Sequence, residues 1–197
     1  MGKVLLLLAC LFIGVRKNYA QDNLKLAKDK DGIKVFTGPV SASDYYAFKA
    51  VMSLKSTEIE ILKILKDVGN YPEWFAFTSS VKLIYQNGNS HQFILETDYP
   101  WPYSNECKNY TMMFTKKQDG KQEITITGSE IKTGCKYSLK KANGYILLEA
   151  DGVNTKITYY FHSEPSQNIP SWLINPRIHE MPFQTFISLR KRIYNSK

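Results

Sequence analysis

Strand-like segments fill the middle of the chain, and a helix-like segment follows them. Between residues 81 and 162, apolar and polar side chains alternate in short segments separated by turn residues such as Asp119-Gly120 and Asp151-Gly152. Connections this short join antiparallel neighbours, because parallel strands need long crossovers. We therefore predict an antiparallel meander whose strands lie at residues 81–85, 91–97, 106–115, 122–127, 137–150 and 155–162.

Two further strands and a helix precede this meander. Residues 33–36 and 45–54 have the composition and alternation of strands. Thr57 and Glu60 have the spacing of a capping box, and the apolar residues that follow recur at helical intervals. Pro72 is suited to starting a second, short helical turn.

The C-terminal segment has the pattern of an amphipathic helix. Over residues 183–194 the apolar side chains recur at intervals of three and four. Pro182 is predicted to break or kink this segment, with the longer helix after it. Since a single sheet has one apolar face to bury, this helix is the expected cover. The predicted fold class is α+β: a curved antiparallel sheet wrapped around a long C-terminal helix, with a short helical insert after the second strand.

Residues 1–20 have the features of a secretory signal peptide. Lys3 precedes an apolar run over residues 4–15 that is too short to span a bilayer, and polarity returns at Arg16. We predict a signal peptide at 1–20 and one domain at 21–197, exported to the periplasm or secreted. Leu7-Leu8-Ala9-Cys10 also resembles a bacterial lipobox, so a lipoprotein anchored through Cys10 is the alternative.

Charge and cysteine usage limit the partners of the exported domain. Removing residues 1–20 takes away three basic residues and lowers the formal net charge from +8 to +5. The remaining charge is spread along the chain, which argues against nucleic acid as a partner. Two interpretations of the basic residues stay open: they are simply solvated at the surface, or they make transient contact with an anionic membrane surface. Export into an oxidising compartment allows a disulfide between Cys107 and Cys135, although the sequence leaves their pairing open. We expect a monomer.

The sequence contains no recognisable catalytic or metal-binding motif. We therefore predict no cofactor, no metal and no catalytic residue, and instead the binding or transport of a lipid or other hydrophobic molecule between sheet and helix. The alternative is an enzyme of the cyclase, aromatase or hydrolase type on the same fold, which needs a titratable group facing the cavity. Its candidates are Glu96, Asp98, Tyr137 and His162.

Several motifs, in order over roughly residues 24–195, resemble those of START domains, the lipid-binding branch of the Bet v 1-like helix-grip superfamily. The most specific are Tyr99-Pro100-Trp101-Pro102 and Ile169-Pro170-Ser171-Trp172-Leu173. The resemblance implies a hydrophobic tunnel between the sheet and the C-terminal helix, and binding or transfer of a lipid, sterol or similar ligand without chemistry. Where the family often has Arg-Asp after the first motif, this chain has Glu106-Cys107. No basic residue is evident in the middle strands to anchor a charged group, which favours an uncharged ligand.

The predicted cavity wall combines inward-facing strand residues with positions that the resemblance adds. The resemblance places Trp101 and Trp172 in loops near opposite approaches to the cavity, and a face of the C-terminal helix at its closure. The predicted lining residues are Trp74, Phe93, Leu95, Trp101, Tyr110, Met112, Phe114, Ile146, Leu148, Ile157, Tyr159, Trp172, Phe183, Phe186 and Ile187.

Overall fold

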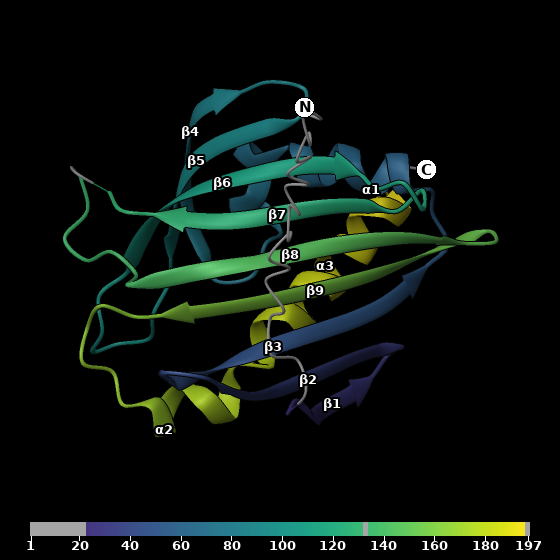
Figure 1. The fold of residues 1–197 in the computed structure, drawn as a ribbon. Coiled ribbons are helices and arrows are strands. Elements are labelled where there is room, and N and C mark those ends of the chain that lie inside the picture. The colour runs from purple at the N-terminus through teal and green to yellow at the C-terminus, as the bar shows by residue number, and fades with distance from the viewer. Residues whose placement is uncertain (1–22, 132–133, 196–197) are drawn as a thin grey trace, which may run out of the picture.

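The computed structural model describes residues 23–131 and 134–195, which contain one curved antiparallel sheet of nine strands (Figure 1). The strand order is β1-β2-β3-β9-β8-β7-β6-β5-β4, so β3 and β9 are the only neighbours within it that are not consecutive strands. The strands are β1 (Lys25–Lys30), β2 (Ile33–Val40), β3 (Ser43–Leu54), β4 (Thr78–Gln86), β5 (Ser90–Thr97), β6 (Glu106–Lys116), β7 (Gln122–Ser129), β8 (Lys141–Asp151) and β9 (Asn154–Glu164).

The predicted antiparallel sheet is confirmed, with two corrections to its strands. The prediction missed β1, because its residues are mostly exposed and lack apolar alternation; its pairing with β2 defines it as a strand. The helical insert consequently follows the third strand rather than the second. The strand expected from residue 137 begins at Lys141 and runs unbroken through Gly144, where a Cβ atom would collide with the backbone of β9.

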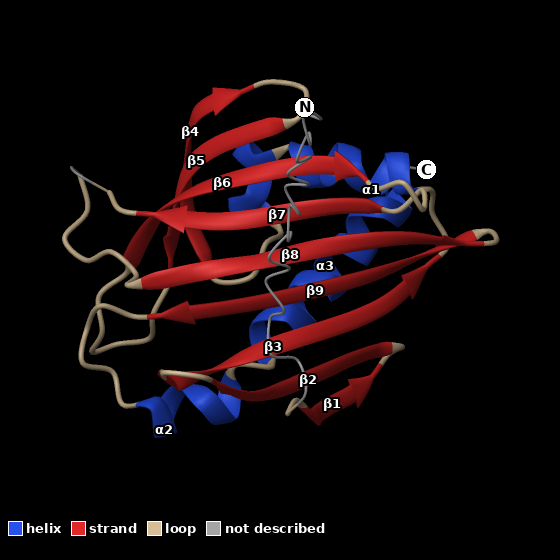
Figure 2. Ribbon diagram, in the orientation of Figure 1, coloured by secondary structure: helices blue, strands red, loops and turns tan. Residues whose placement is uncertain are grey.

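The helices cover one face of the sheet, as Figure 2 shows for α1 and α3 behind the strands. The predicted capping box is present, since the Glu60 amide donates to Thr57 Oγ1 and the Glu60 carboxylate accepts from the Thr57 amide. Pro182 does not break the last helix as predicted, because it lies in the first turn, where its missing N–H is not needed. The helical elements are α1 (Glu58–Lys66), η1 (Val68–Glu73), α2 (Ser171–Ile174), η2 (Asn175–Arg177) and α3 (Glu180–Asn195).

The core lies between the sheet and these helices. Helix α3 packs against β2 and β3, and buries one face that includes Phe186 and Leu189. Phe48 of β3 and Tyr159 of β9 meet edge to face in this core, with 5.0 Å between ring centroids. Over the described residues, no helix has the length and apolar character needed to cross a bilayer.

Candidate functional site

A cavity of about 90 Å³ lies on the covered face of the sheet. Strands β5 to β9 form its wall. Residues 75–77, between η1 and β4, form part of its rim together with Thr78 at the start of β4 and Met181 of α3. We call residues 75–77 the roof segment. The lining residues are Tyr71, Phe75, Ala76, Phe77, Thr78, Phe93, Leu95, Thr97, Tyr99, Tyr110, Met112, Ile126, Leu139, Ile146, Tyr159, Phe161, Ser163 and Met181.

The cavity lining is apolar and aromatic, with uncharged polar groups. Among the described residues, no Asp, Glu, Lys, Arg or His lines it. Its side-chain hydroxyl groups come from four tyrosines, Thr78, Thr97 and Ser163. An apolar pocket with a few polar groups is the usual form of a small-molecule binding site.

The tyrosine hydroxyls at the cavity are neutral over the physiological pH range. Burial is the main cause that raises the pKa of Tyr71, Tyr99, Tyr110 and Tyr159 above the ordinary value for tyrosine. Each hydroxyl therefore stays protonated and can both donate and accept a hydrogen bond. The Tyr71 hydroxyl already donates to the carbonyl oxygen of Leu65 over 2.6 Å.

Three hydrogen bonds made by its backbone groups hold the roof segment in place, the first from the Phe75 amide to the Tyr71 carbonyl over 2.8 Å. The Ala76 amide donates to Thr185 Oγ1 of α3 over 3.2 Å, and the Asp98 amide donates to the Phe77 carbonyl over 2.9 Å. Phe77 has a φ of +57° and is 46% exposed. Because a bulky side chain disfavours positive φ, the roof segment carries local backbone strain beside the cavity.

The loop before β6 and the segment after β9 are joined at the same end of the sheet. The Ser104 amide donates to Gln167 Oε1 over 3.0 Å, and Gln167 Nε2 donates to the Ser104 carbonyl over 2.7 Å. Glu106 is fully buried and accepts hydrogen bonds from the amides of Ser166 and Gln167. Glu106, one of the two residues that stand where START domains often have Arg-Asp, thus stabilises this junction and does not line the cavity.

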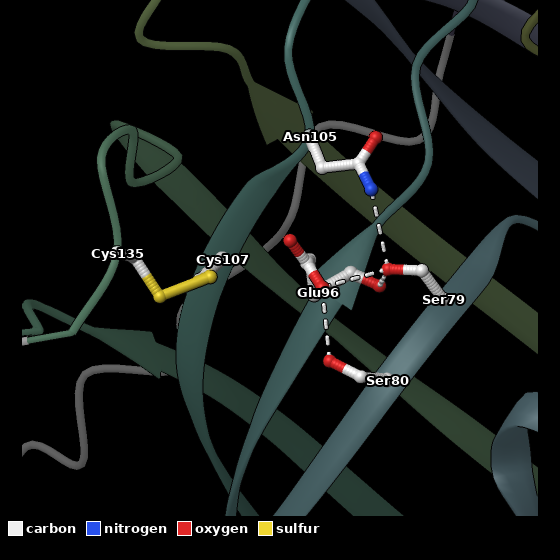
Figure 3. The surroundings of a disulfide bond; sticks show 6 residues. All are labelled: Ser79, Ser80, Glu96, Asn105, Cys107 and Cys135. Carbon is white, nitrogen blue, oxygen red and sulfur yellow. Dashed lines mark hydrogen bonds between the residues drawn. A yellow bond between two sulfur atoms is a disulfide. The ribbon is translucent and has the colours of Figure 1, made fainter.

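A disulfide joins Cys107 of β6 to Cys135, with 6.1 Å between the Cα atoms (Figure 3). Backbone hydrogen bonds add to this link, because the Cys107 amide donates to the Tyr137 carbonyl and the Leu139 amide to the Cys107 carbonyl. Leu139 lines the cavity, so the disulfide and these bonds fix one part of its wall.

The structure places some of the predicted wall residues at the cavity. These are Phe93, Leu95, Tyr110, Met112, Ile146 and Tyr159, all from strands. The others lie elsewhere: Trp74, Phe114, Leu148, Ile157, Phe183 and Phe186 are buried core residues, and Ile187 packs partly buried against that core. The helix residues miss the cavity because α3 packs against β2 and β3, which fills that part of the interior.

Trp101 lies in the loop before β6, whereas Trp172 lies in the short helix α2 and not in a loop as expected, and neither lines the cavity. Trp101 is 92% exposed and Trp172 is 74% exposed. The loop of Trp101 and the segment that leads into α2 are linked through Ser104 and Gln167, so both tryptophans lie at one end of the sheet. Trp172 contributes to a shallow surface depression with Tyr45 and Pro170.

The lining residues that come from loops and helix ends, such as Phe75, Phe77, Tyr99 and Met181, are not predicted by the sequence pattern. No periodic pattern marks them, because their position depends on how the helical insert folds back over the sheet. Thr97 is different, since the alternation that selected Phe93 and Leu95 extends to it.

The four candidate groups for an enzyme do not line the cavity. Glu96 is held by the hydroxyls of Ser79 and Ser80 on β4, as Figure 3 shows. His162 Nε2 lies 3.1 Å from Ser43 Oγ, and the residues on either side of it, Phe161 and Ser163, are the ones that line the cavity. Within residues 23–131 and 134–195, no group of His, Cys, Asp and Glu side chains could hold a metal ion.

Comparison with known proteins places this geometry in a family. An uncharacterized protein from Pseudomonas aeruginosa is 30% identical over 190 residues, which cover 93% of each chain. A crystal structure of a STAR-related lipid transfer protein from Xanthomonas axonopodis is 28% identical, with a TM-score of 0.82, and the match covers 88% of this chain and 99% of that one. No family model matches the chain.

A more distant comparison supports the fold alone. Human StAR-related lipid transfer protein 5 has a TM-score of 0.76 at 14% identity, and the match covers 89% of this chain and 88% of that one. The curved antiparallel sheet closed by a C-terminal helix defines a helix-grip protein. Taken with the bacterial relatives, it identifies the chain as a member of the START-domain family.

Proposed function

We propose that this protein binds and carries a lipid or other hydrophobic small molecule without chemical conversion. The observation that carries the proposal is the cavity lined by apolar and uncharged polar side chains on the covered face of the sheet. The Xanthomonas protein of the same fold is described as a lipid transfer protein, which supports the same role here. Burial of a lipid tail would contribute about 0.8 kcal/mol per CH₂ group.

Binding requires the cavity to enlarge. Its volume of about 90 Å³ is below the roughly 300–1,000 Å³ of typical ligand sites. The roof segment is the part that we expect to withdraw, because three hydrogen bonds of its backbone groups hold it, fewer than a paired strand makes, and Phe77 is strained. The strand wall, in contrast, is tied into the sheet on both sides.

Native mass spectrometry of protein purified from its own host tests the proposal. We expect a hydrophobic adduct that survives gentle ionisation and is lost when the same sample is denatured. Protein that is consistently empty, and that takes up no lipid from an added total lipid extract, would refute the carrier function.

We further propose that the domain is exported, through cleavage of the signal peptide at residues 1–20, which lie outside the described residues. The disulfide between Cys107 and Cys135 supports this, because such bonds persist in oxidising compartments. Cell fractionation and the intact mass of the mature chain test it. A mass that includes an acylated Cys10 would instead show the lipoprotein alternative.

Membrane contact is proposed at the end of the sheet that carries Trp101 and Trp172. Exposed tryptophan rings suit the membrane–water interface, and the net charge of +5 after export favours an anionic surface. We expect the monomer to bind transiently to vesicles that contain an anionic lipid, with blue-shifted tryptophan emission. Vesicles of neutral lipid are the control, and emission that never shifts would exclude this contact.

A further inference from the structure

Three of the four tyrosine hydroxyls at the cavity have no hydrogen-bond partner among the described residues, and two of the three, those of Tyr110 and Tyr159, belong to buried residues. Tyr110 of β6 and Tyr159 of β9 are 6% and 2% exposed, and both line the cavity. Among the described residues, neither hydroxyl makes a hydrogen bond, whereas the hydroxyl of Tyr71 donates to the Leu65 carbonyl. A buried tyrosine hydroxyl usually has a partner, because leaving one unpaired is costly. The wall therefore offers two polar atoms to a molecule inside the cavity.

The two hydroxyls belong to one electrostatic group. Besides burial, Tyr110 and Tyr71 both raise the pKa of Tyr159, and Tyr110 also raises the pKa of Tyr99. Strands β7 and β8 lie between β6 and β9 in the sheet, so the hydroxyls approach the cavity from two sides of its wall. A polar group on a bound molecule can therefore reach either hydroxyl from inside the cavity.

The charge of the surroundings limits what that polar group is. No charged side chain among the described residues lines the cavity. An ionised carboxylate or phosphate would lose its hydration without gaining a counter-ion, which strongly opposes binding. A neutral hydroxyl or carbonyl group loses less, and the tyrosine hydroxyls replace its hydrogen bonds to water.

Aromatic rings flank the same two tyrosines. Tyr110 lies 5.8 Å from Phe93 and 6.3 Å from Phe161, and Tyr159 lies 6.0 Å from Phe161, measured between ring centroids. Walls of this kind pack well against flat ring systems in offset or edge-to-face geometry. A small ring compound also needs less enlargement of the cavity than a long acyl chain.

We propose that the cavity selects a neutral hydrophobic molecule with a hydroxyl or carbonyl group, which hydrogen-bonds to Tyr110 and Tyr159. This inference rests on the proposed carrier function and specifies the chemical class of its ligand. It distinguishes alcohols and ketones from the corresponding carboxylates and from plain hydrocarbons.

Three probes that share one ring system test the proposal at neutral pH. They are 2-naphthol, naphthalene and ionised 2-naphthoate, each added to the full mature chain preloaded with the neutral dye N-phenyl-1-naphthylamine. We expect 2-naphthol to displace the dye best and 2-naphthoate least. Tyr110→Phe and Tyr159→Phe remove only the oxygen, and each should weaken 2-naphthol about three- to tenfold while naphthalene is unaffected. Tyr194→Phe, at an exposed position on α3, is the matched control and should change nothing.

The outcomes separate this inference from the carrier function. If 2-naphthol and naphthalene bind and both phenylalanine variants keep the full affinity for 2-naphthol, the carrier function stands and the tyrosine assignment is wrong. The assignment also fails if the variants weaken both probes equally, because the rings then act only by packing, or if 2-naphthoate binds best. If neither the dye nor any probe binds, the carrier function itself fails.

Discussion

One hydrogen bond ties the roof segment to α3, and Thr185→Val removes it. The Ala76 amide donates to Thr185 Oγ1 over 3.2 Å, and valine keeps the shape of threonine but lacks the oxygen. A hydrogen bond of this kind contributes about 1 kcal/mol net. That free energy corresponds to roughly a fivefold change in the equilibrium between a held and a withdrawn roof. Because we infer that ligand passes the roof, we expect the association rate to rise by about fivefold.

Stopped-flow mixing with N-phenyl-1-naphthylamine measures that rate, since the dye becomes fluorescent in an apolar site. Thr155→Val is the matched control, because Thr155 Oγ1 donates to the Ser56 carbonyl over 2.7 Å and is equally buried. At about 3.3 Å per residue, Thr155 lies about 13 Å along β9 from Tyr159, the nearest cavity residue of that strand, and it does not contact the roof segment. The control should lose similar stability at an unchanged association rate. An unchanged rate in Thr185→Val, or an equal rise in both variants, would refute the roof mechanism.

Three further predictions concern stability, each measured by urea unfolding. Replacing Cys107 and Cys135 by serine should lower the free energy of unfolding by about 3–4 kcal/mol, because the disulfide closes a loop with a sequence separation of 28; equal stability under reducing and oxidising conditions would contradict this. Phe186→Ala should cost about 3–5 kcal/mol, since this ring fills the contact of α3 with the sheet, and a cost below 1 kcal/mol would show that the contact is loose. Burial, helped by Lys66, lowers the pKa of His91 below 6.5 in the folded state, so the unfolded chain binds the extra proton first. Stability should therefore fall as the pH drops below about 6.5, and His91→Gln should flatten that slope; an unchanged slope would assign it to other groups.

Local patterns were sufficient for most of the fold. Thr57 and Glu60 predicted the start of α1, because a capping box is a contact within one turn of the chain. The alternation of apolar and polar residues in β5 and β6 correctly predicted that Phe93 and Tyr110 face the interior, while their immediate neighbours in each strand are less buried. The edge strand β1 was missed because its pairing with β2, and not its own composition, makes it a strand.

The candidate site was only partly predictable, because a cavity forms where side chains from different elements leave the space between them unfilled. Periodicity assigned Leu148 and Tyr159 to the same interior face, yet one is in the filled core and the other lines the cavity. The difference depends on where α3 crosses the sheet, which no local pattern encodes. Phe77 was missed for a related reason, since its role follows from the fold of the roof segment.

The interior is divided by the position of the last helix. Helix α3 lies against β2 and β3, so its apolar face fills one half of the covered surface, while the cavity lies over β5 to β9. Helix α1 packs against β8, but the cavity itself is covered by Tyr71 of η1, the roof segment, Tyr99 and Met181. Segments with few backbone hydrogen bonds open at lower free energy than strands or helices. The position of α3 over β2 and β3 therefore leaves the cavity unfilled, and it also leaves the roof segment, which opens most easily, as the part that a ligand has to pass.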